Sequence, residues 1–239
     1  MPKAKSVKPA KPVSPKWRRR PEDRPQQIIE AALAVFGECG LANARLQAIA
    51  DRAGVSKGTI YLYFPNKEEL FREMIRETAV AAIESGEKTV GHGTPTEQLR
   101  SAMRGYWNFV RSPVFGTIYR LVLGELHQFP DLAAFYADEV VSRGLKLLSG
   151  ILRQGVESGE FREIDPMIAA RMLVALTVMH GIWRDEHTGV PLLCHKTDEA
   201  VFQELAQFYL HAITPFANCT AQADGAPSDS VSFIPFDND

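Results

Sequence analysis

Between about residue 25 and residue 213, hydrophobic residues recur every three or four positions, and no stretch alternates convincingly between apolar and polar. A first helix carries Ile29, Leu33 and Phe36 on one face and ends at Gly40. Two short helices follow, and then a long helix from Asn66 to about Ser85. Prolines and glycines separate the later helices, which are expected at 96–111, 114–128, 131–158, 166–187 and 198–213. The pattern predicts an all-α protein of about nine helices.

Composition narrows the class of protein. The 239 residues are 45% hydrophobic and 23% charged, which is ordinary for a soluble globular chain. No apolar run approaches the roughly 18 residues that span a bilayer, and the N-terminus lacks the apolar segment of a secretory signal. Three widely separated cysteines (Cys39, Cys194 and Cys219) do not make a disulfide framework. We therefore expect a cytoplasmic protein with no membrane contact.

The net charge of -2 conceals three segments of different sign. Residues 1–24 carry nine Lys/Arg against two Asp/Glu, whereas residues 215–239 carry four Asp and no basic residue. The remaining body has a net charge of about −5. We expect a disordered basic arm at 1–24 and a flexible acidic tail at 215–239. A basic arm keeps a polyanionic partner possible despite the near-neutral total.

Residues 45–64 have the spacing of two short helices joined by a tight turn. Ala50 is small enough for a close helix crossing, and Gly54 falls where the turn is needed. Val55 fills the corner, and Ile60 is placed to pack against the first short helix. Ser56 is a good N-cap for the second helix, which in DNA-binding proteins enters the major groove.

The segment GVSKGTIYLYFPNKEELF (Gly54–Phe71), preceded by IADRA at 49–53, resembles the helix-turn-helix signature of the TetR family of transcriptional regulators. The resemblance covers roughly residues 26–72 and combines several independent elements, among them Gly58-Thr59, Tyr63-Phe64 and Asn66-Lys67-Glu68. A weaker similarity to the ligand domain of one subgroup lies at Arg120–Leu132.

The resemblance implies a three-helix DNA-binding domain at 25–71 and a helical ligand-binding and dimerisation domain at 72–214. It places DNA contacts at Arg45, Gln47, Lys57, Gly58, Thr59, Tyr61, Leu62, Tyr63 and Lys67. The two tyrosines would meet phosphates or sugars, and Gly58 would let the backbone approach the duplex. Thr59 and Leu62 would read bases, while Lys67 would contact a phosphate at a helix N-terminus.

Two positions depart from the family pattern. Arg45 stands where many members have Thr or Ser, so it cannot cap the helix through a hydroxyl, and Asn43 could cap instead if the helix starts earlier. Ala48 stands where a polar residue is usual, so one surface contact is missing. These departures affect the details of DNA contact rather than the core of the motif.

The expected DNA-binding domain has a net charge of −1, which is weak for binding phosphates. We hypothesise that Lys16 and Arg18–Arg20 of the arm supply the missing charge by following the DNA backbone or entering the minor groove. The alternative is that the arm is only an unordered, solubilising tail.

The C-terminal helices suggest a ligand cavity and a dimer interface. Candidate cavity residues on the central helices are Trp107, Phe115, Tyr119, His127, Phe135, Met172, His180 and Trp183. Each could instead be ordinary core. The helices at 166–187 and 198–213 are apolar on more than one face, which favours a partner helix over purely internal packing. The resemblance implies that this partner is a second copy of the chain, in a homodimer.

The sequence thus predicts a ligand-responsive regulator, most often a repressor, which binds a palindromic operator as a dimer and is released by a small apolar or aromatic effector. A sequence-nonspecific architectural DNA binder is one alternative, and an enzyme or carrier built on the C-terminal bundle is another. We find no catalytic residues, phosphate loop or cofactor site. His187, Cys194 and His195 lack a fourth metal ligand and are typical of a surface loop.

Overall fold

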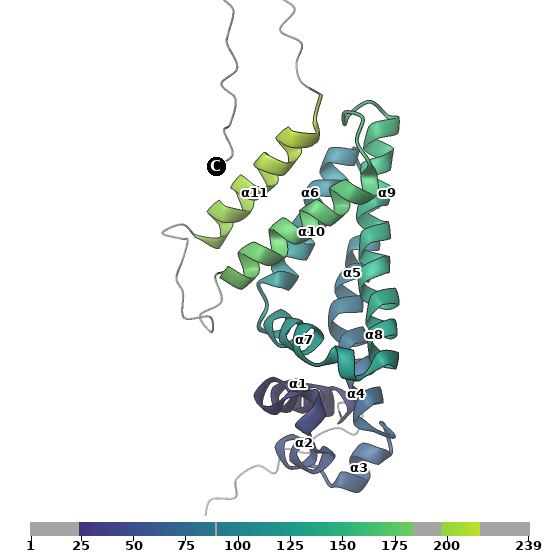
Figure 1. The fold of residues 1–239 in the computed structure, drawn as a ribbon, viewed down its shortest axis with the longest axis vertical. Helices are drawn as coiled ribbons and strands as arrows, with labels where there is room; N and C mark the ends of the chain where they lie inside the picture. The colour runs from purple at the N-terminus through teal and green to yellow at the C-terminus, as the bar shows by residue number, and fades with distance from the viewer. Residues whose placement is uncertain (1–23, 89, 184–196, 216–239) are drawn as a thin grey trace, which may run out of the picture.

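The computed structural model describes residues 24–88, 90–183 and 197–215 (Figure 1). The α-helices are α1 (Arg24–Asn43), α2 (Leu46–Ala53), α3 (Lys57–Tyr61), α4 (Lys67–Ile75), α5 (Ala81–Glu87), α6 (Pro95–Val110), α7 (Pro113–Gly124), α8 (Pro130–Tyr136), α9 (Arg143–Glu157), α10 (Pro166–Trp183) and α11 (Asp198–Ile213). The basic arm before Arg24, the tail after residue 215 and the expected end of the 166–187 helix lie outside the described residues.

Two long helices continue through single π-helical turns. Arg76–Val80 joins α4 to α5, and Ala137–Ser142 joins α8 to α9. If α4–α5 and α8–α9 are each counted as one continuous helix, the described part of the chain has nine helices. The same residues contain no strand. The predicted all-α class is therefore confirmed.

Helix starts follow the capping residues of the sequence. The Asn66 side chain accepts a hydrogen bond from the Glu69 amide at 2.7 Å. Asp165 Oδ1 accepts from the Met167 and Ile168 amides at 2.8 and 2.9 Å. These contacts satisfy amides that have no partner inside their helices, so each start is fixed locally.

Helix α1 breaks at Gly40, as predicted, although one further helical turn follows before Asn43. Gly40 has φ 78° and ψ 168°, a conformation that strongly favours glycine. A Cβ at this position would lie inside the carboxylate of Glu125, at the C-terminal end of α7. The kink therefore brings the end of α1 against a distant segment.

The structure has two hydrophobic cores. The first contains α1–α4 together with Ile118, Leu121, Leu126 and Leu132, which come from α7, the following 3-10 turn and α8. The second is built from α6, α9, α10 and α11. In Figure 1, α7 and α8 lie directly on the α1–α4 bundle, while α5 and α9 run side by side away from it. The helices α7 and α8 thus connect the two halves.

Candidate DNA-binding surface and effector cavity

The turn between α2 and α3 has the geometry that the sequence spacing predicts. Gly54 adopts a left-handed conformation (φ 66°, ψ 35°), and the Val55 amide donates to the Ala50 carbonyl at 3.0 Å. Ile49 and Ile60 are fully buried beside Ala50. The two helices are therefore fixed to each other by a tight turn and a shared apolar contact.

Helix α3 presents apolar and aromatic side chains to solvent. Leu62 is 82% exposed, and Tyr61 and Tyr63 are 50% and 41% exposed. The ammonium of Lys57 lies 5.7 Å from the centroid of the Tyr61 ring. Because a monomeric protein has no internal reason to expose three neighbouring large side chains, this surface is a candidate for contact with another molecule.

Two small residues shape the start of α3. Ser56 Oγ accepts from the Thr59 amide at 3.1 Å and lies 2.9 Å from Thr59 Oγ1, so the Thr59 hydroxyl is engaged in the cap. A Cβ on Gly58 would meet only Ser56 Oγ, at an ordinary distance of 3.7 Å. Nothing among the described residues therefore requires a glycine at position 58.

The start of α2 differs from one alternative left open by the sequence. Arg45 is the N-cap residue, with an extended backbone and no side-chain capping hydrogen bond. The side-chain amide of Asn43 donates to the Cys39 carbonyl at 3.2 Å, within α1. Capping of α2 by Asn43 is therefore wrong, because α2 begins only at Leu46. Gln47 donates to Asp51 Oδ1 at 2.8 Å, and both side chains lie on the exposed face.

Lys67 lies at the first turn of α4, where a phosphate contact was expected. Its ammonium donates to the carbonyls of Leu41 and Ala42 at 2.8 and 2.7 Å, and it lies 5.9 Å from the Phe129 ring. Lys67 thus caps the C-terminal end of α1. An ammonium group has three N–H donors, so this arrangement leaves one donor for another acceptor.

A cavity of about 560 Å³ lies in the C-terminal half of the molecule, within the size range of ligand sites. Its walls come from α5–α10 and are largely apolar. Of the residues proposed from sequence, Phe115 and Tyr119 line it, and their rings stack with centroids 5.7 Å apart. The lining residues that sequence reasoning missed include Tyr106, Phe109, Tyr136 and Arg171.

The other proposed pocket residues lie elsewhere. Trp107 is buried in the second core against Phe202, with ring centroids 6.1 Å apart. The Phe135 ring lies outside the lining, near the guanidinium groups of Arg72 and Arg76.

His127 and Met172 are exposed, and His180 is half-buried; none of the three lines the cavity. The side chain of Trp183 is outside the described residues. The sequence could not separate cavity, core and exposed positions, because large apolar residues occupy all three on these helices.

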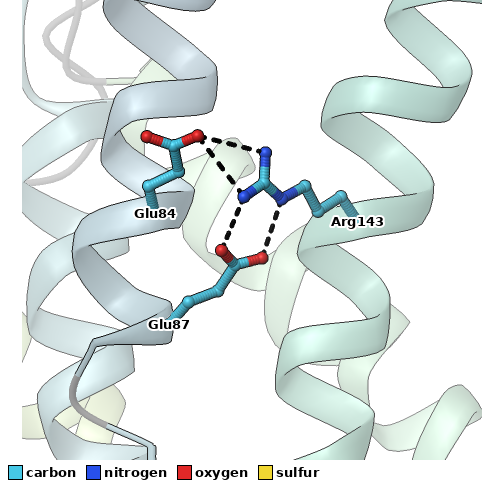
Figure 2. Close-up of polar contacts among 3 residues, drawn as sticks. All are labelled: Glu84, Glu87 and Arg143. Atoms are coloured by element: carbon cyan, nitrogen blue, oxygen red, sulfur yellow. Dashed lines mark hydrogen bonds and ion pairs between the residues drawn. The ribbon is translucent and has the colours of Figure 1, made fainter.

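An ion cluster joins two walls of the cavity. The Arg143 guanidinium donates to both carboxylate oxygens of Glu87, at 2.7 and 2.6 Å, and contacts Glu84 at 3.4 Å. Figure 2 shows the two glutamates extending from α5 toward Arg143 on α9. The hydrogen bonds from Arg143 hold the pKa of Glu87 below its usual value. Gly86 and Gly144, next to these residues in sequence, line the cavity.

Helix α7 lies between the cavity and the α1–α4 bundle. Phe115, Tyr119 and Val122 line the cavity, whereas Ile118 and Leu121 belong to the first hydrophobic core. Just beyond α7, the Glu125 carboxylate accepts from the Ala42 amide at 2.8 Å. Lys67 donates to the carbonyls of Leu41 and Ala42 at the same end of α1. The end of α1 is therefore held by both Glu125 and Lys67.

The described part of the chain shows neither a metal site nor a membrane-spanning helix. Its residues contain no group of three His, Cys, Asp or Glu side chains placed to hold a metal, and the segment with His187, Cys194 and His195 lies outside it. None of the described helices is both long and apolar enough to cross a membrane.

Comparison with known proteins gives two family matches. The family described as "Bacterial regulatory proteins, tetR family" matches residues 28–74, and "AefR-like transcriptional repressor, C-terminal domain" matches residues 97–212. The fatty acid metabolism regulator protein of Bacillus subtilis (strain 168) is 32% identical over 149 residues, which is 62% of this chain and 76% of the relative.

Solved structures of bacterial regulators have a similar fold. The regulator FadR from Bacillus subtilis, in complex with stearoyl-CoA, superposes with a TM-score of 0.64 at 26% identity and covers 77% of this chain and 97% of its own. The fatty acid degradation regulator FadR from Bacillus halodurans superposes with a TM-score of 0.62 at 26% identity, covering 81% and 96%.

Proposed function

Because the chain belongs to the TetR family of bacterial regulatory proteins and is a DNA-binding transcriptional regulator, we propose that it is a dimeric repressor of a palindromic operator, released by a small apolar effector. We assign DNA binding to residues 25–71 and effector binding and dimerisation to residues 72–214. The exposed Tyr61, Leu62 and Tyr63 at α3 are the observation that carries the proposal.

In this proposal, α3 lies in the major groove, and Thr59 and Leu62 face base edges. The tyrosines, Arg45, Gln47 and Lys57 contact the backbone or neighbouring bases. Gly58 admits the DNA backbone because it has no Cβ. Lys67 keeps its two bonds to the end of α1 and uses its remaining donor for a phosphate.

Dimerisation is proposed through α10 and α11. Their exposed apolar side chains are Met167, Ile168, Met172, Leu176, Met179 and Phe208. The two helices share the second core, and the Tyr209 hydroxyl of α11 donates to the Ala169 carbonyl of α10 at 2.7 Å. A second copy would cover these apolar faces, and a two-fold dimer would place two α3 helices on a symmetric operator.

The effector is proposed to bind the α5–α10 cavity. Its apolar walls and volume support a long or aromatic apolar ligand, as does the stearoyl-CoA bound by the related Bacillus subtilis regulator. Helix α7 is the proposed route of coupling, because it contacts both the cavity and the bundle that carries α3. An effector releases DNA only if it binds more tightly to the dimer whose α3 helices are wrongly spaced.

The test is selection of bound DNA from a random pool, followed by footprinting of the selected site and by a panel of small molecules that disrupt the complex. Protection of a palindrome supports the proposed repressor. Uniform coverage of the duplex would instead identify a sequence-nonspecific architectural protein. An apolar compound that releases the selected DNA supports the effector assignment.

A further inference from the structure

The cavity contains a polar group that an entirely apolar effector would not use. We infer that Tyr106, Tyr119 and Tyr136 form a subsite that binds the acyl oxygen of a fatty-acid derivative, whose hydrocarbon chain fills the rest of the cavity. This inference rests on the proposed effector site and names the chemical class that the site selects.

The three tyrosines come from different helices, α6, α7 and α8, and all line the cavity. Among the described residues, no hydrogen bond joins any of their hydroxyls to another protein group. The three residues are half-buried, and none of their hydroxyls is a fully buried polar atom without a partner, so each hydroxyl is open to the cavity or to solvent. The free protein leaves the role of hydrogen-bond partner to water or to a ligand.

The hydroxyls of Tyr106 and Tyr136 stay protonated at neutral pH and can donate hydrogen bonds. Burial raises the pKa of Tyr136 to about 12, and burial together with the nearby Tyr136 and Tyr119 raises the pKa of Tyr106 still further. Tyr119 lines the same cavity as Tyr106 and Tyr136. Three phenol hydroxyls in one apolar cavity suit a carbonyl or carboxylate oxygen as acceptor.

The charge of the lining agrees with this class. Arg171 is the one charged residue among the lining side chains that the structure describes, and no acidic side chain lines the cavity. An anionic ligand therefore meets no like charge. A fatty acid and an acyl-CoA both have the acyl oxygen and the hydrocarbon chain. The experiment below therefore distinguishes between these two ligands.

The subsite also lies where binding can affect DNA. Tyr119 belongs to α7, whose neighbouring face, with Ile118 and Leu121, belongs to the first hydrophobic core beside α1. A hydrogen bond to Tyr119 favours one position of α7 over another. Release from DNA requires that the ligand bind more tightly to the released conformation than to the DNA-binding conformation. The hydrogen bond between the acyl oxygen and Tyr119 would supply this difference in affinity.

The experiment measures ligand binding to the full chain without DNA. The probe is N-phenyl-1-naphthylamine, a fluorescent apolar compound without oxygen, and the competitors are stearate and stearoyl-CoA. The variants Tyr106→Phe, Tyr119→Phe and Tyr136→Phe each remove one hydroxyl and keep the ring. We expect unchanged probe affinity in each variant, and a loss of about two- to tenfold in competitor affinity for each hydroxyl that contacts the ligand.

The outcomes separate the two proposals. Failure of the probe to bind the wild-type protein would overturn the apolar effector cavity itself. Probe binding with equal displacement by stearate or stearoyl-CoA in wild type and all three variants would overturn only the tyrosine subsite. Probe binding without displacement by either competitor would also overturn the acyl assignment. If stearate displaces the probe more strongly, the ligand is a free fatty acid. If stearoyl-CoA displaces it more strongly, the ligand is an acyl thioester.

Discussion

At the scale of single residues, Gly58 shows how sequence and structure combine. The sequence gives a glycine near the start of a short helix, where glycine weakens helical structure. The structure offers no internal reason for it, since a Cβ there would touch only a cap hydroxyl at 3.7 Å. This fits the proposal that the operator backbone approaches closely at Gly58.

Gly58→Ala should therefore separate stability from DNA binding. We expect a melting temperature equal to or above that of the wild type, because alanine favours a helix by about 0.5–1 kcal/mol. Operator affinity should fall about fivefold or more, because the new methyl group meets the DNA backbone. Calorimetry and fluorescence anisotropy with the selected operator measure the two effects.

The matched control is Gly150→Ala, in α9, where a Cβ would meet nothing within 4 Å. It should raise stability in the same way and leave operator affinity unchanged. Wild-type affinity in Gly58→Ala would show that the DNA backbone does not approach this position.

At the scale of elements, α7 and the α5–α9 pair make contacts around the cavity that their sequences do not reveal. Helix α7 supplies side chains to the cavity and to the first core, and it leads into Glu125, which contacts the end of α1. Helices α5 and α9 are joined by Arg143 beside the cavity. These contacts suggest that changes at the cavity reach the DNA-binding bundle through α7.

Glu125→Ala should weaken that coupling. It removes the acceptor of the Ala42 amide but no lining residue of the cavity. We expect a smaller ratio between operator affinities measured without and with an effector, at unchanged effector affinity. Glu139→Ala, an exposed position in the π-helical turn before α9, removes the same charge as a control. An unchanged ratio in Glu125→Ala would assign the coupling to other contacts.

Glu87→Gln tests the link between α5 and α9. The folded-state pKa of Glu87 is lowered, so its contribution to stability is present above its usual pKa and is lost as the pH falls through the lowered value. We expect a loss of under about 1 kcal/mol at pH 7, because both side chains are partly exposed.

Chemical unfolding at neutral and acidic pH measures this difference, which should shrink in acid. Glu84→Gln, whose contact with Arg143 is longer, should cost less. A destabilisation by Glu87→Gln that is the same at both pH values would point to packing rather than charge.

At the scale of the whole molecule, α10 and α11 carry large apolar side chains that are exposed in the single chain. Met172 and Phe208 are 59% and 68% exposed. Large apolar side chains grouped in this way are typical of protein interfaces. The dimer is therefore proposed from the exposed faces of these helices, and the operator symmetry follows from the dimer.

The variants Met172→Glu and Phe208→Glu should each shift the protein from dimer toward monomer, since a buried unpaired carboxylate opposes association. Sedimentation velocity measures the change, and operator affinity should fall with it. Leu123→Glu changes an equally exposed side chain on α7 and should leave the dimer intact. A dimer that survives both changes would place the interface on another surface.

The basic arm belongs to the same scale, because it changes the charge that the whole molecule brings to DNA. Deletion of residues 1–20 removes eight Lys/Arg and no acidic residue. If the arm contacts phosphates, affinity should fall, and the slope of log affinity against log salt should flatten by about one for each lost contact. An unchanged slope would leave the arm as a solubilising tail.

Much of the fold follows from local sequence. Helical periodicity, the caps at Ser56, Asn66 and Asp165, and the left-handed turn at Gly54 are set by neighbouring residues, and the structure has them where expected. The helix-turn-helix could be identified for the same reason, since its spacing lies within about twenty residues. Local chemistry is enough to specify such features.

The tertiary structure decided what depends on distant contacts. Trp107 and Tyr106 are neighbours in sequence, yet one fills the second core and the other lines the cavity, because helix packing determines which apolar face meets a void. Lys67 has the sequence position of a phosphate contact, but the fold brings the end of α1 to its ammonium. The sequence by itself determined the all-α class, the capped helix starts at Ser56, Asn66 and Asp165, and the DNA-binding motif. Only the packing of those helices placed the cavity and its tyrosines, because such contacts join residues that are far apart along the chain.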